Sequence, residues 1–176
     1  MLNQASKIGV CIAGLGFGQS VHIPALRSNN ILNPIAAWHP NKEKLDQLTK
    51  TNEIKGYNEW NTVLSDREIE AIVIATPPHP RYQLAVEALS AGKHLLLEKP
   101  VALNYNQINE INRLACKNDL SVAVDFEYRA VPLFMQAKRL LMQKKIGDIW
   151  FVKFDWLMSS RANKLRPWSW YSCQEE

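Results

Sequence analysis

A glutamate and a lysine follow an apolar run in the stretch HLLLEKPVAL, residues 94–103, and their position suggests chemistry. Leu95 to Leu97 are followed directly by Glu98, Lys99 and Pro100. A lysine can hydrogen-bond a substrate hydroxyl or carboxyamide, its pKa falls when the ammonium group is removed from water, and Glu98 could orient it. The simpler interpretation is an exposed turn, because charged side chains usually lie in solvent.

A second candidate is a glycine-rich stretch near the N-terminus. Three glycines alternate with apolar residues directly after the run KIGVCIA: Gly14, Leu15, Gly16, Phe17 and Gly18. Between a strand and a helix, the first glycine permits a tight turn and the second lets the backbone approach a pyrophosphate at the helix N-terminus. The third glycine of the usual fingerprint falls at Gln19, so we expect the helix slightly farther from the sheet. The pattern favours dinucleotide binding over glycines that serve only a tight turn.

His39 stands where an NAD-binding protein usually has an acidic residue, about 20 residues beyond the glycines. No carboxylate occurs before Glu43, which is expected in the next helix. An acid there would repel a 2′-phosphate, and Lys42 and Lys44 are close enough in sequence to attract one. The sequence therefore favours NADP over NAD, although both lysines could simply be solvated helix residues.

Alternating apolar runs and helical patterns must position these residues. Strands are expected at 7–13, 35–38, 72–75, 94–97 and 122–126, with a minor strand near Gly56 and Tyr57. Helices are expected at 17–27 with a break at Pro24, and at 41–51, 81–91, 104–117 and 131–145. This order predicts an α/β fold with a Rossmann-type, doubly wound parallel sheet. Ligands bind at the carboxyl ends of such strands, so the glycine stretch, Thr76 to His79 and Glu98 to Pro100 should line one cleft.

The last part of the chain has a different pattern. Apolar residues alternate over 150–158, which predicts the first strand of an incomplete C-terminal α/β domain. The expected domains are 1–121 (Rossmann), 122–146 (last Rossmann strand and connecting helix) and 147–176 (a truncated domain). One strand cannot form a sheet, so we expect a homodimer or larger assembly through residues 148–160, with Trp168 and Trp170 over the seam. A tail that folds back or is disordered is the alternative.

Four stretches resemble the Gfo/Idh/MocA (glucose-fructose oxidoreductase / inositol dehydrogenase / rhizopine catabolism) family. They are GLGFGQSVHIPAL, ATPPH, AGKHLLLEKP and DFEYR. The resemblance implies hydride transfer between NAD(P) and a sugar, cyclitol or related alcohol. It implies that Lys99 contacts the reacting hydroxyl and that four residues line the cofactor: Thr76, Pro77, His79 and Glu98. Family members continue into a segment that carries an acid/base His and an Asp, so this chain is expected to be an inactive or weak fragment. Its four histidines are not expected to replace that segment.

Arg129 has two interpretations. Asp125, Glu127 and Arg129 alternate with apolar residues at a predicted strand end. Arg129 could face the nicotinamide side of the cleft, or it could join an ion-pair network that holds the helix at 131–145.

Composition restricts the partners. The net charge is +4 without a dense Lys/Arg block, which fits an anionic small ligand better than nucleic acid. No signal peptide or membrane-spanning stretch is recognised, the three cysteines are expected to be free thiols in a reducing cytoplasm, and no metal site is expected. A non-catalytic nucleotide-binding regulator on the same fold is the alternative function. An S-adenosylmethionine-dependent methyltransferase also uses a glycine loop, but it would not explain the Glu98–Lys99–Pro100 stretch.

Overall fold

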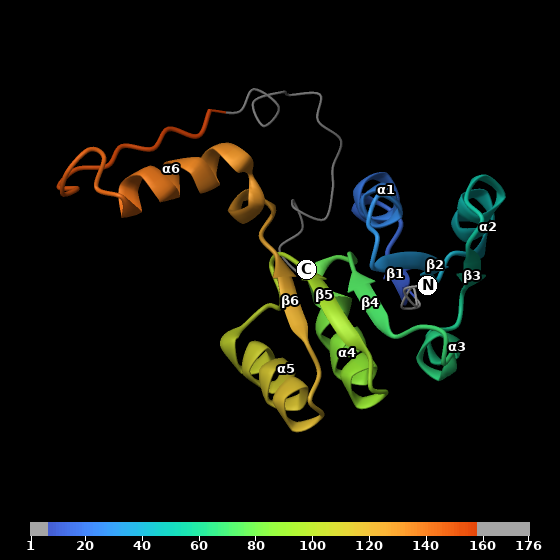
Figure 1. Ribbon diagram of the computed structural model, residues 1–176. Coiled ribbons are helices and arrows are strands. Elements are labelled where there is room, and N and C mark those ends of the chain that lie inside the picture. The colour runs from blue at the N-terminus through green and yellow to red at the C-terminus, as the bar shows by residue number, and fades with distance from the viewer. Residues whose placement is uncertain (1–6, 158–176) are drawn as a thin grey trace, which may run out of the picture. The chain divides into compact units, whose positions relative to one another are not determined.

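A six-stranded parallel sheet organises the first part of the chain (Figure 1). The computed structural model describes residues 7–157, which divide after Asp125 into two compact units. The strands are β1 (Ile8–Ala13), β2 (Leu32–Trp38), β3 (Lys55–Tyr57), β4 (Ala71–Ile74), β5 (His94–Glu98) and β6 (Val122–Asp125). Their order in the sheet is β3-β2-β1-β4-β5-β6, which confirms the predicted Rossmann-type fold.

Helices cover both faces of this sheet. The helical segments of the first unit are η1 (Gly18–His22), α1 (Ile23–Arg27), α2 (Lys42–Thr51), α3 (Trp60–Ser65), α4 (Pro78–Ser90) and α5 (Tyr105–Lys117). Figure 1 shows α1 and α2 on one face and α3, α4 and α5 on the other. Each connection returns the chain to a parallel strand, so every strand ends at the same edge of the sheet.

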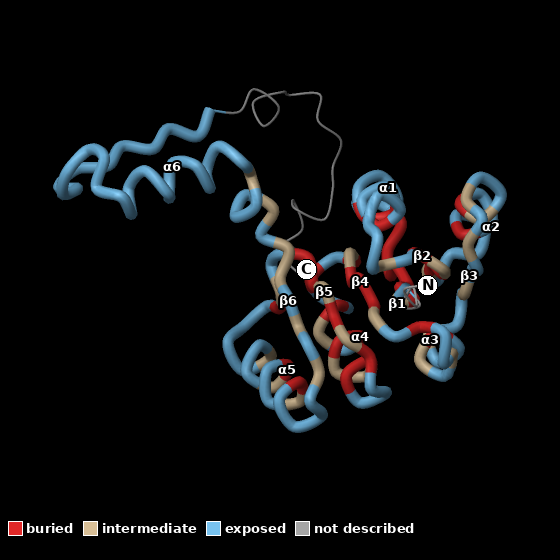
Figure 2. The backbone as a smooth tube through the Cα atoms, viewed as in Figure 1, coloured by how far each residue is buried: buried red, intermediate tan, exposed pale blue. Residues whose placement is uncertain are grey.

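The apolar runs of the sequence are strands with both faces buried (Figure 2). In β1, Val10 and Ile12 pack into the core cluster beneath α1 and α2, whereas Cys11 and Ala13 pack into the cluster beneath α3, α4 and α5. All four residues are at most 2% exposed. A strand between two helix layers needs apolar residues at consecutive positions, which explains the unbroken run.

The helix boundaries follow local signals, some of which the sequence predicted. Asn41 caps α2 as expected, because its side chain accepts a hydrogen bond from the Lys44 amide. Pro24 lies in the first turn of α1, as expected, but the predicted break is absent: η1 runs directly into α1, and both His22 and Ile23 have helical dihedral angles. Two predictions were incomplete: α3 was not predicted, and α4 begins at Pro78 rather than at Arg81.

The second unit contains η2 (Glu127–Ala130), a 3₁₀ turn, and α6 (Pro132–Met142). The strand predicted over 150–158 is not formed: residues 149–157 have no regular secondary structure, and position 158 lies outside the described residues, as do Trp168 and Trp170. A strand requires a hydrogen-bonded partner, and none is formed within residues 126–157. The domain limits predicted from the sequence stay a prediction.

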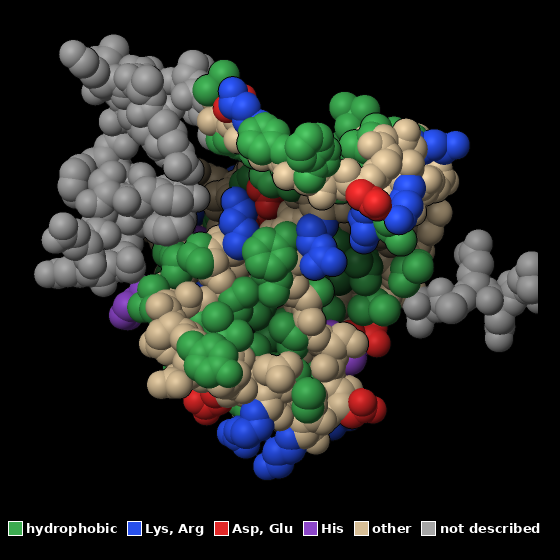
Figure 3. Space-filling model, turned by 90° about the vertical axis from the view of Figure 1, so that its left-hand side faces the viewer, with side chains coloured by type: hydrophobic (Ala, Val, Ile, Leu, Met, Phe, Trp, Pro, Cys, Tyr) green, Lys and Arg blue, Asp and Glu red, His purple; other side chains and the backbone are tan. Residues whose placement is uncertain are grey.

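Aromatic rings hold part of this second unit together. Tyr128 contacts Trp156 edge-on with ring centroids 4.9 Å apart, and Phe154 stacks on Trp156 at 6.1 Å. Many other large apolar side chains of this unit are exposed, and Figure 3 shows hydrophobic side chains at the molecular surface beside Lys and Arg. The unit thus buries only a small part of its apolar surface.

Candidate functional site

The glycine turn lies where β1 ends beside β4. Gly14 has φ +102°, and a Cβ atom there would be 2.8 Å from the backbone carbonyl of Ala75. The Gly14 amide donates a 3.1 Å hydrogen bond to the Trp38 carbonyl at the end of β2. Only glycine combines this positive φ with so close an approach of backbone to backbone.

Gly16 and Gly18 serve different purposes. A Cβ atom at Gly16 would meet nothing within 4 Å, so the turn leaves open space there. At Gly18 a Cβ atom would be 2.6 Å from Cγ2 of Ile12. Gly18 therefore supplies the close helix–sheet packing of the third fingerprint glycine. The expectation that Gln19 holds this helix farther from the sheet is wrong, because the π-helix η1 begins with Gly18 in contact with β1.

Thr76 follows β4 next to the glycine turn and has an unused hydroxyl. The residue is 8% exposed, and its Oγ1 makes no hydrogen bond with any part of the chain that the structure describes. A buried hydroxyl without a partner is unfavourable, so a ligand that supplies one is stabilised here. Pro77 directly precedes α4 and His79 lies in its first turn; both are exposed.

The Glu98–Lys99–Pro100 stretch forms the turn after β5 and combines a buried acid with an exposed lysine. Glu98 is the last residue of β5 and is 7% exposed, whereas Lys99 is exposed. The Lys99 amide donates to Glu98 Oε2 at 3.2 Å, and the Lys99–Pro100 peptide bond is cis. The turn thus keeps the Glu98 carboxylate inside and presents Lys99 at the surface. The exposed-turn interpretation holds for Lys99 and Pro100 but not for Glu98.

Arg81 fixes the ends of two strands, and sequence reasoning missed it. Its guanidinium is buried and donates to the backbone carbonyls of Thr76, Glu98 and Pro100. In the sequence Arg81 is indistinguishable from an ordinary helix residue. Its one signal is its position two residues after ATPPH, the stretch in which α4 begins.

His22 was also missed. Its Nε2 lies 3.1 Å from Glu98 Oε1 and 3.8 Å from Asp125 Oδ2, and the residue is 5% exposed. The ring also meets Phe17 edge-on, with centroids 5.5 Å apart. The donor atoms of the three polar side chains lie within 4.8 Å of one another, and their types could hold a divalent metal ion. The direct imidazole–carboxylate contact satisfies both groups without an ion.

His39 lies at the end of β2, as predicted. Its amide donates to the Tyr57 carbonyl at 3.1 Å, and its Nδ1 accepts from the Asn41 amide at 3.0 Å. Burial lowers the pKa of His39, and the Lys44 ammonium group acts in the same direction. Lys42 and Lys44 are exposed at the start of α2. A half-buried imidazole and two flexible cations therefore occupy the place of the usual acid.

Arg129 does not belong to the sheet unit. It lies in η2, where its amide donates to the Phe126 carbonyl at 2.9 Å. The predicted alternation along a strand is wrong beyond Asp125, because β6 ends there and residues 127–130 turn as a 3₁₀ helix. The ion-pair role and the cofactor role of Arg129 both stay predictions.

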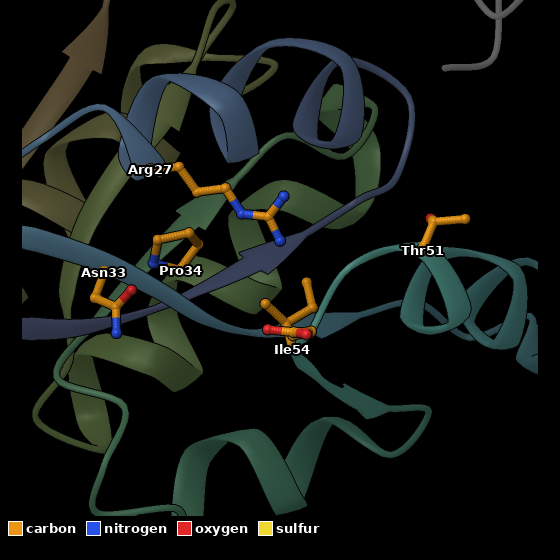
Figure 4. Close-up of a pocket in the computed structure, with 6 residues that line it drawn as sticks. Arg27, Asn33, Pro34, Thr51 and Ile54 are labelled. Carbon is orange, nitrogen blue, oxygen red and sulfur yellow. The ribbon is translucent and has the colours of Figure 1, made fainter.

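A hollow of about 410 Å³ lies away from the glycine turn, near the amino end of β2 (Figure 4). Its lining comes from the end of α1, the start of β2, the last residue of α2 and the segment after it: Arg27, Asn33, Pro34, Thr51, Glu53 and Ile54. Asn33 and Pro34 belong to the amino end of β2, opposite the edge where the glycine turn lies. Ligands of such sheets bind at the carboxyl edge, so this hollow is not the candidate site.

The strand order brings the candidate residues together. β1, β4 and β5 are neighbours, and each ends in one of the three predicted stretches: Gly14 to Gly18, Thr76 to His79, and Glu98 to Pro100. The open space at Gly16, the unpartnered Thr76 hydroxyl and the close-packed Gly14 and Gly18 fit a dinucleotide at this edge. These features define the class: a dinucleotide-binding Rossmann domain.

The chain belongs to the oxidoreductase family with an NAD-binding Rossmann fold, the Gfo/Idh/MocA family, whose model matches residues 8–126. The resemblance noted in the sequence is thereby confirmed. The family match covers all six strands of the sheet and the three stretches at its carboxyl edge.

Known relatives agree with this assignment. The chain is 38% identical over 176 residues to an uncharacterized oxidoreductase of Synechocystis sp., covering 99% of this chain and 47% of the relative. It is 29% identical over 113 residues to levoglucosan dehydrogenase of Pseudarthrobacter phenanthrenivorans, covering 64% of this chain and 29% of that protein. The scyllo-inositol dehydrogenase of Lactobacillus casei, solved with NAD(H) and scyllo-inositol, matches with a TM-score of 0.75 and 26% identity over 81% of this chain and 43% of that one.

The chain thus spans about half the length, or less, of the relatives it matches. Of the helices within residues 7–157, none combines the length and the apolar character that crossing a membrane requires.

Proposed function

We propose that this chain is the NAD(P)-binding portion of an oxidoreductase that transfers hydride between nicotinamide and a sugar, cyclitol or related alcohol. One observation carries the proposal: the glycine turn, Thr76 and the Glu98–Lys99 turn end three adjacent strands at one edge of the sheet. Phosphate-binding and proton-handling groups that share one edge are what a nicotinamide enzyme requires.

Each stretch has a proposed role. The backbone from Gly14 to Gly18 approaches the pyrophosphate, and Thr76, Pro77 and His79 line the cofactor together with Glu98. When bound, the nicotinamide supplies or accepts the hydride. Lys99 hydrogen-bonds the reacting hydroxyl and holds or releases its proton, which its exposure at the carboxyl edge permits. Arg129 is proposed on the nicotinamide side of the cleft.

The substrate class is supported by the relatives. Levoglucosan dehydrogenase and scyllo-inositol dehydrogenase are named for polyhydroxylated ring compounds. A cation such as Lys99 suits a substrate that offers hydroxyl groups. We therefore propose a small polyol or sugar as the substrate of the whole protein.

NADP is proposed as the preferred cofactor. His39 occupies the end of β2, so no carboxylate stands there to repel a 2′-phosphate, and Lys42 and Lys44 are exposed nearby. We further propose that the 176-residue chain associates with itself through residues 148–160, because the described part of this segment is apolar and exposed.

Titration with NADH and NADPH, followed by nicotinamide fluorescence, tests the function. Saturable binding of either cofactor supports the proposal, and binding together with turnover of a polyol or sugar extends it to catalysis. If the chain, joined to the C-terminal part of a relative, binds the cofactor but turns over no alcohol, a nucleotide-binding regulator is favoured. A folded chain that binds neither cofactor at millimolar concentration contradicts the proposal.

A further inference from the structure

His22 connects three segments of the sheet unit that are far apart in sequence. It is the last residue of η1, the π-helix that begins at Gly18. Its Nε2 contacts the carboxylate of Glu98, 76 positions later at the end of β5, and approaches that of Asp125 at the end of β6. The side chains of His22 and Glu98 are only 7% and 9% exposed, so water competes little for this contact.

We propose that His22 is a positioning residue: it holds the Glu98 carboxylate, and through it the Lys99 turn, in the orientation that the nicotinamide end of the cofactor requires. This proposal rests on the proposed function, because it assumes that the Glu98–Lys99 turn faces a nicotinamide.

The imidazole acts here as a hydrogen-bond donor. Nε2 faces carboxylate oxygens at 3.1 Å and 3.8 Å, and carboxylates only accept, so Nε2 carries a hydrogen. A buried carboxylate that loses its donor is costly and turns toward water or takes up a proton. Replacing His22 therefore releases Glu98 from its observed orientation.

The Glu98 carboxylate links His22 to the Lys99 turn through its two oxygens. One carboxylate oxygen, Oε1, is held by His22, and the other, Oε2, accepts the Lys99 amide at 3.2 Å. The backbone of the same turn is held independently, because Arg81 donates to the carbonyls of Glu98 and Pro100. Loss of His22 should therefore disturb the Glu98 side chain and the Lys99 amide while the strand end stays in place.

Loss of His22 should affect binding of the two halves of the cofactor differently. The backbone of the glycine turn keeps its shape through the close approaches at Gly14 and Gly18, neither of which involves the imidazole. The ring meets this turn through the side chain of Phe17. Binding of the nucleotide half should thus survive the loss of His22, and binding that depends on the nicotinamide ring should weaken.

Hydrogen exchange on the cofactor-free chain tests the positioning directly. His22→Leu should raise the exchange rate of the Lys99 amide about tenfold while amides in β4 keep their protection. His22→Gln, whose amide nitrogen is as many bonds from Cα as Nε2, should restore most of the protection. Lys93→Met is the matched control. Lys93 lies just before the start of β5, and its buried ammonium group donates to the carbonyls of Asp66 and Ile69. Its loss should leave the exchange rate of the Lys99 amide unchanged. Should His22→Leu not fold, His22→Asn, whose amide is too short to reach Glu98, replaces it.

Cofactor binding supplies the second measurement. The probes are NADH against ADP-ribose, or NADPH against 2′-phospho-ADP-ribose. His22→Leu should weaken the reduced dinucleotide about tenfold relative to the nucleotide that lacks nicotinamide. Equal weakening of both probes, or unchanged Lys99 exchange, overturns the positioning role. If the wild type binds no dinucleotide, the proposed function fails, and the exchange result alone decides on His22.

A metal ion is the competing explanation of the same cluster. If ZnCl₂ raises the thermal midpoint and the Lys99 protection of the wild type but not of His22→Gln, the cluster is a metal site and the hydrogen-bond role is overturned. Identical behaviour with ZnCl₂ and with EDTA supports positioning by His22 alone.

Discussion

Arg81 in α4 donates a 2.6 Å hydrogen bond from Nη1 to the backbone carbonyl of Glu98, 17 positions further along the chain. The same guanidinium also reaches the carbonyls of Thr76 and Pro100. One buried cation thereby joins the segment after β4 to the turn after β5. The relative position of the two stretches that we assign to the cofactor depends on it.

Replacing Arg81 with Met should destabilise the chain by roughly 3 kcal/mol, because three carbonyls lose a charged donor in a buried place. Arg67→Met is the control: Arg67 is exposed, and its loss should change the free energy of unfolding by less than about 0.5 kcal/mol. Urea denaturation at pH 7 measures both. Equal stability of the two variants would mean that the Arg81 contacts contribute nothing net.

The fold could be predicted because strands buried on both faces need unbroken apolar runs, as at Val10 to Ala13. Segments with weaker sequence signals were not predicted correctly. α3 has no side-chain hydrogen bond at its N-cap, Glu59, so it lacks the sequence mark that Asn41 gives to α2. The alternation over 150–158 indicated a strand, but a strand forms only with a partner, which a local pattern does not reveal.

The candidate site was predicted only in part, for a related reason. Motifs such as Gly14 to Gly18 carry their chemistry in neighbouring residues and can be recognised locally. The contact between His22 and Glu98 joins positions 76 apart, and Arg81 contributes through backbone carbonyls whose identity the sequence does not encode. Such contacts follow from the strand order, which only the folded chain establishes.

Gly16→Val should lower the affinity for the reduced dinucleotide at least tenfold, about 1.4 kcal/mol. A Cβ atom at Gly16 meets no protein atom within 4 Å, so the variant should fold normally while its side chain fills space intended for phosphate. Gly16→Ala should show a smaller loss in the same direction. Fluorescence titration, with thermal midpoints as the folding control, measures the series. A folded valine variant with wild-type affinity refutes phosphate binding at this turn.

His39→Asp should weaken NADPH about tenfold relative to NADH, because a carboxylate at the end of β2 repels the 2′-phosphate and accepts the ribose hydroxyls instead. Competitive titration with both cofactors gives the ratio. A wild-type chain that strongly prefers NADH contradicts the proposed preference.

The pH dependence of the same ratio has a definite sign. Burial lowers the pKa of His39, so the imidazole is neutral at pH 7.5 and gains its charge only below its ordinary value of about 6.5. Lowering the pH to 5.5 should therefore favour NADPH in the wild type more than in His39→Gln. Comparison with this variant removes the titration of the phosphate itself. Parallel pH profiles would show that His39 does not contact the 2′-phosphate.

Lys99→Ala should lower kcat by about 10²–10⁴ in a catalytically complete protein. This chain can replace the matching 47% of the 38%-identical Synechocystis sp. relative, and turnover of polyols and sugars by that chimera gives the reference rate. Dinucleotide affinity should change less than threefold. Lys99→Arg keeps the charge but exchanges protons poorly, so it should stay slow. A fully active arginine variant would assign Lys99 to substrate binding rather than to proton transfer.

The 176-residue chain should associate with itself through residues 148–160. Trp150 is 97% exposed and Phe151 is 80% exposed, so both of these neighbouring residues present apolar surface to water. Apolar surface of this kind is unfavourable in an isolated chain, and a second copy of the same segment covers it most simply, because one self-complementary patch serves both partners. Sedimentation velocity at micromolar concentration should detect a dimer or larger species. Trp150→Glu and a chain ending at Lys145 should both be monomeric. Leu133→Glu, which places the same charge on the 79%-exposed Leu133 of α6, should remain associated. A monomeric wild type would refute the association, and a monomeric Leu133→Glu would move the interface to α6.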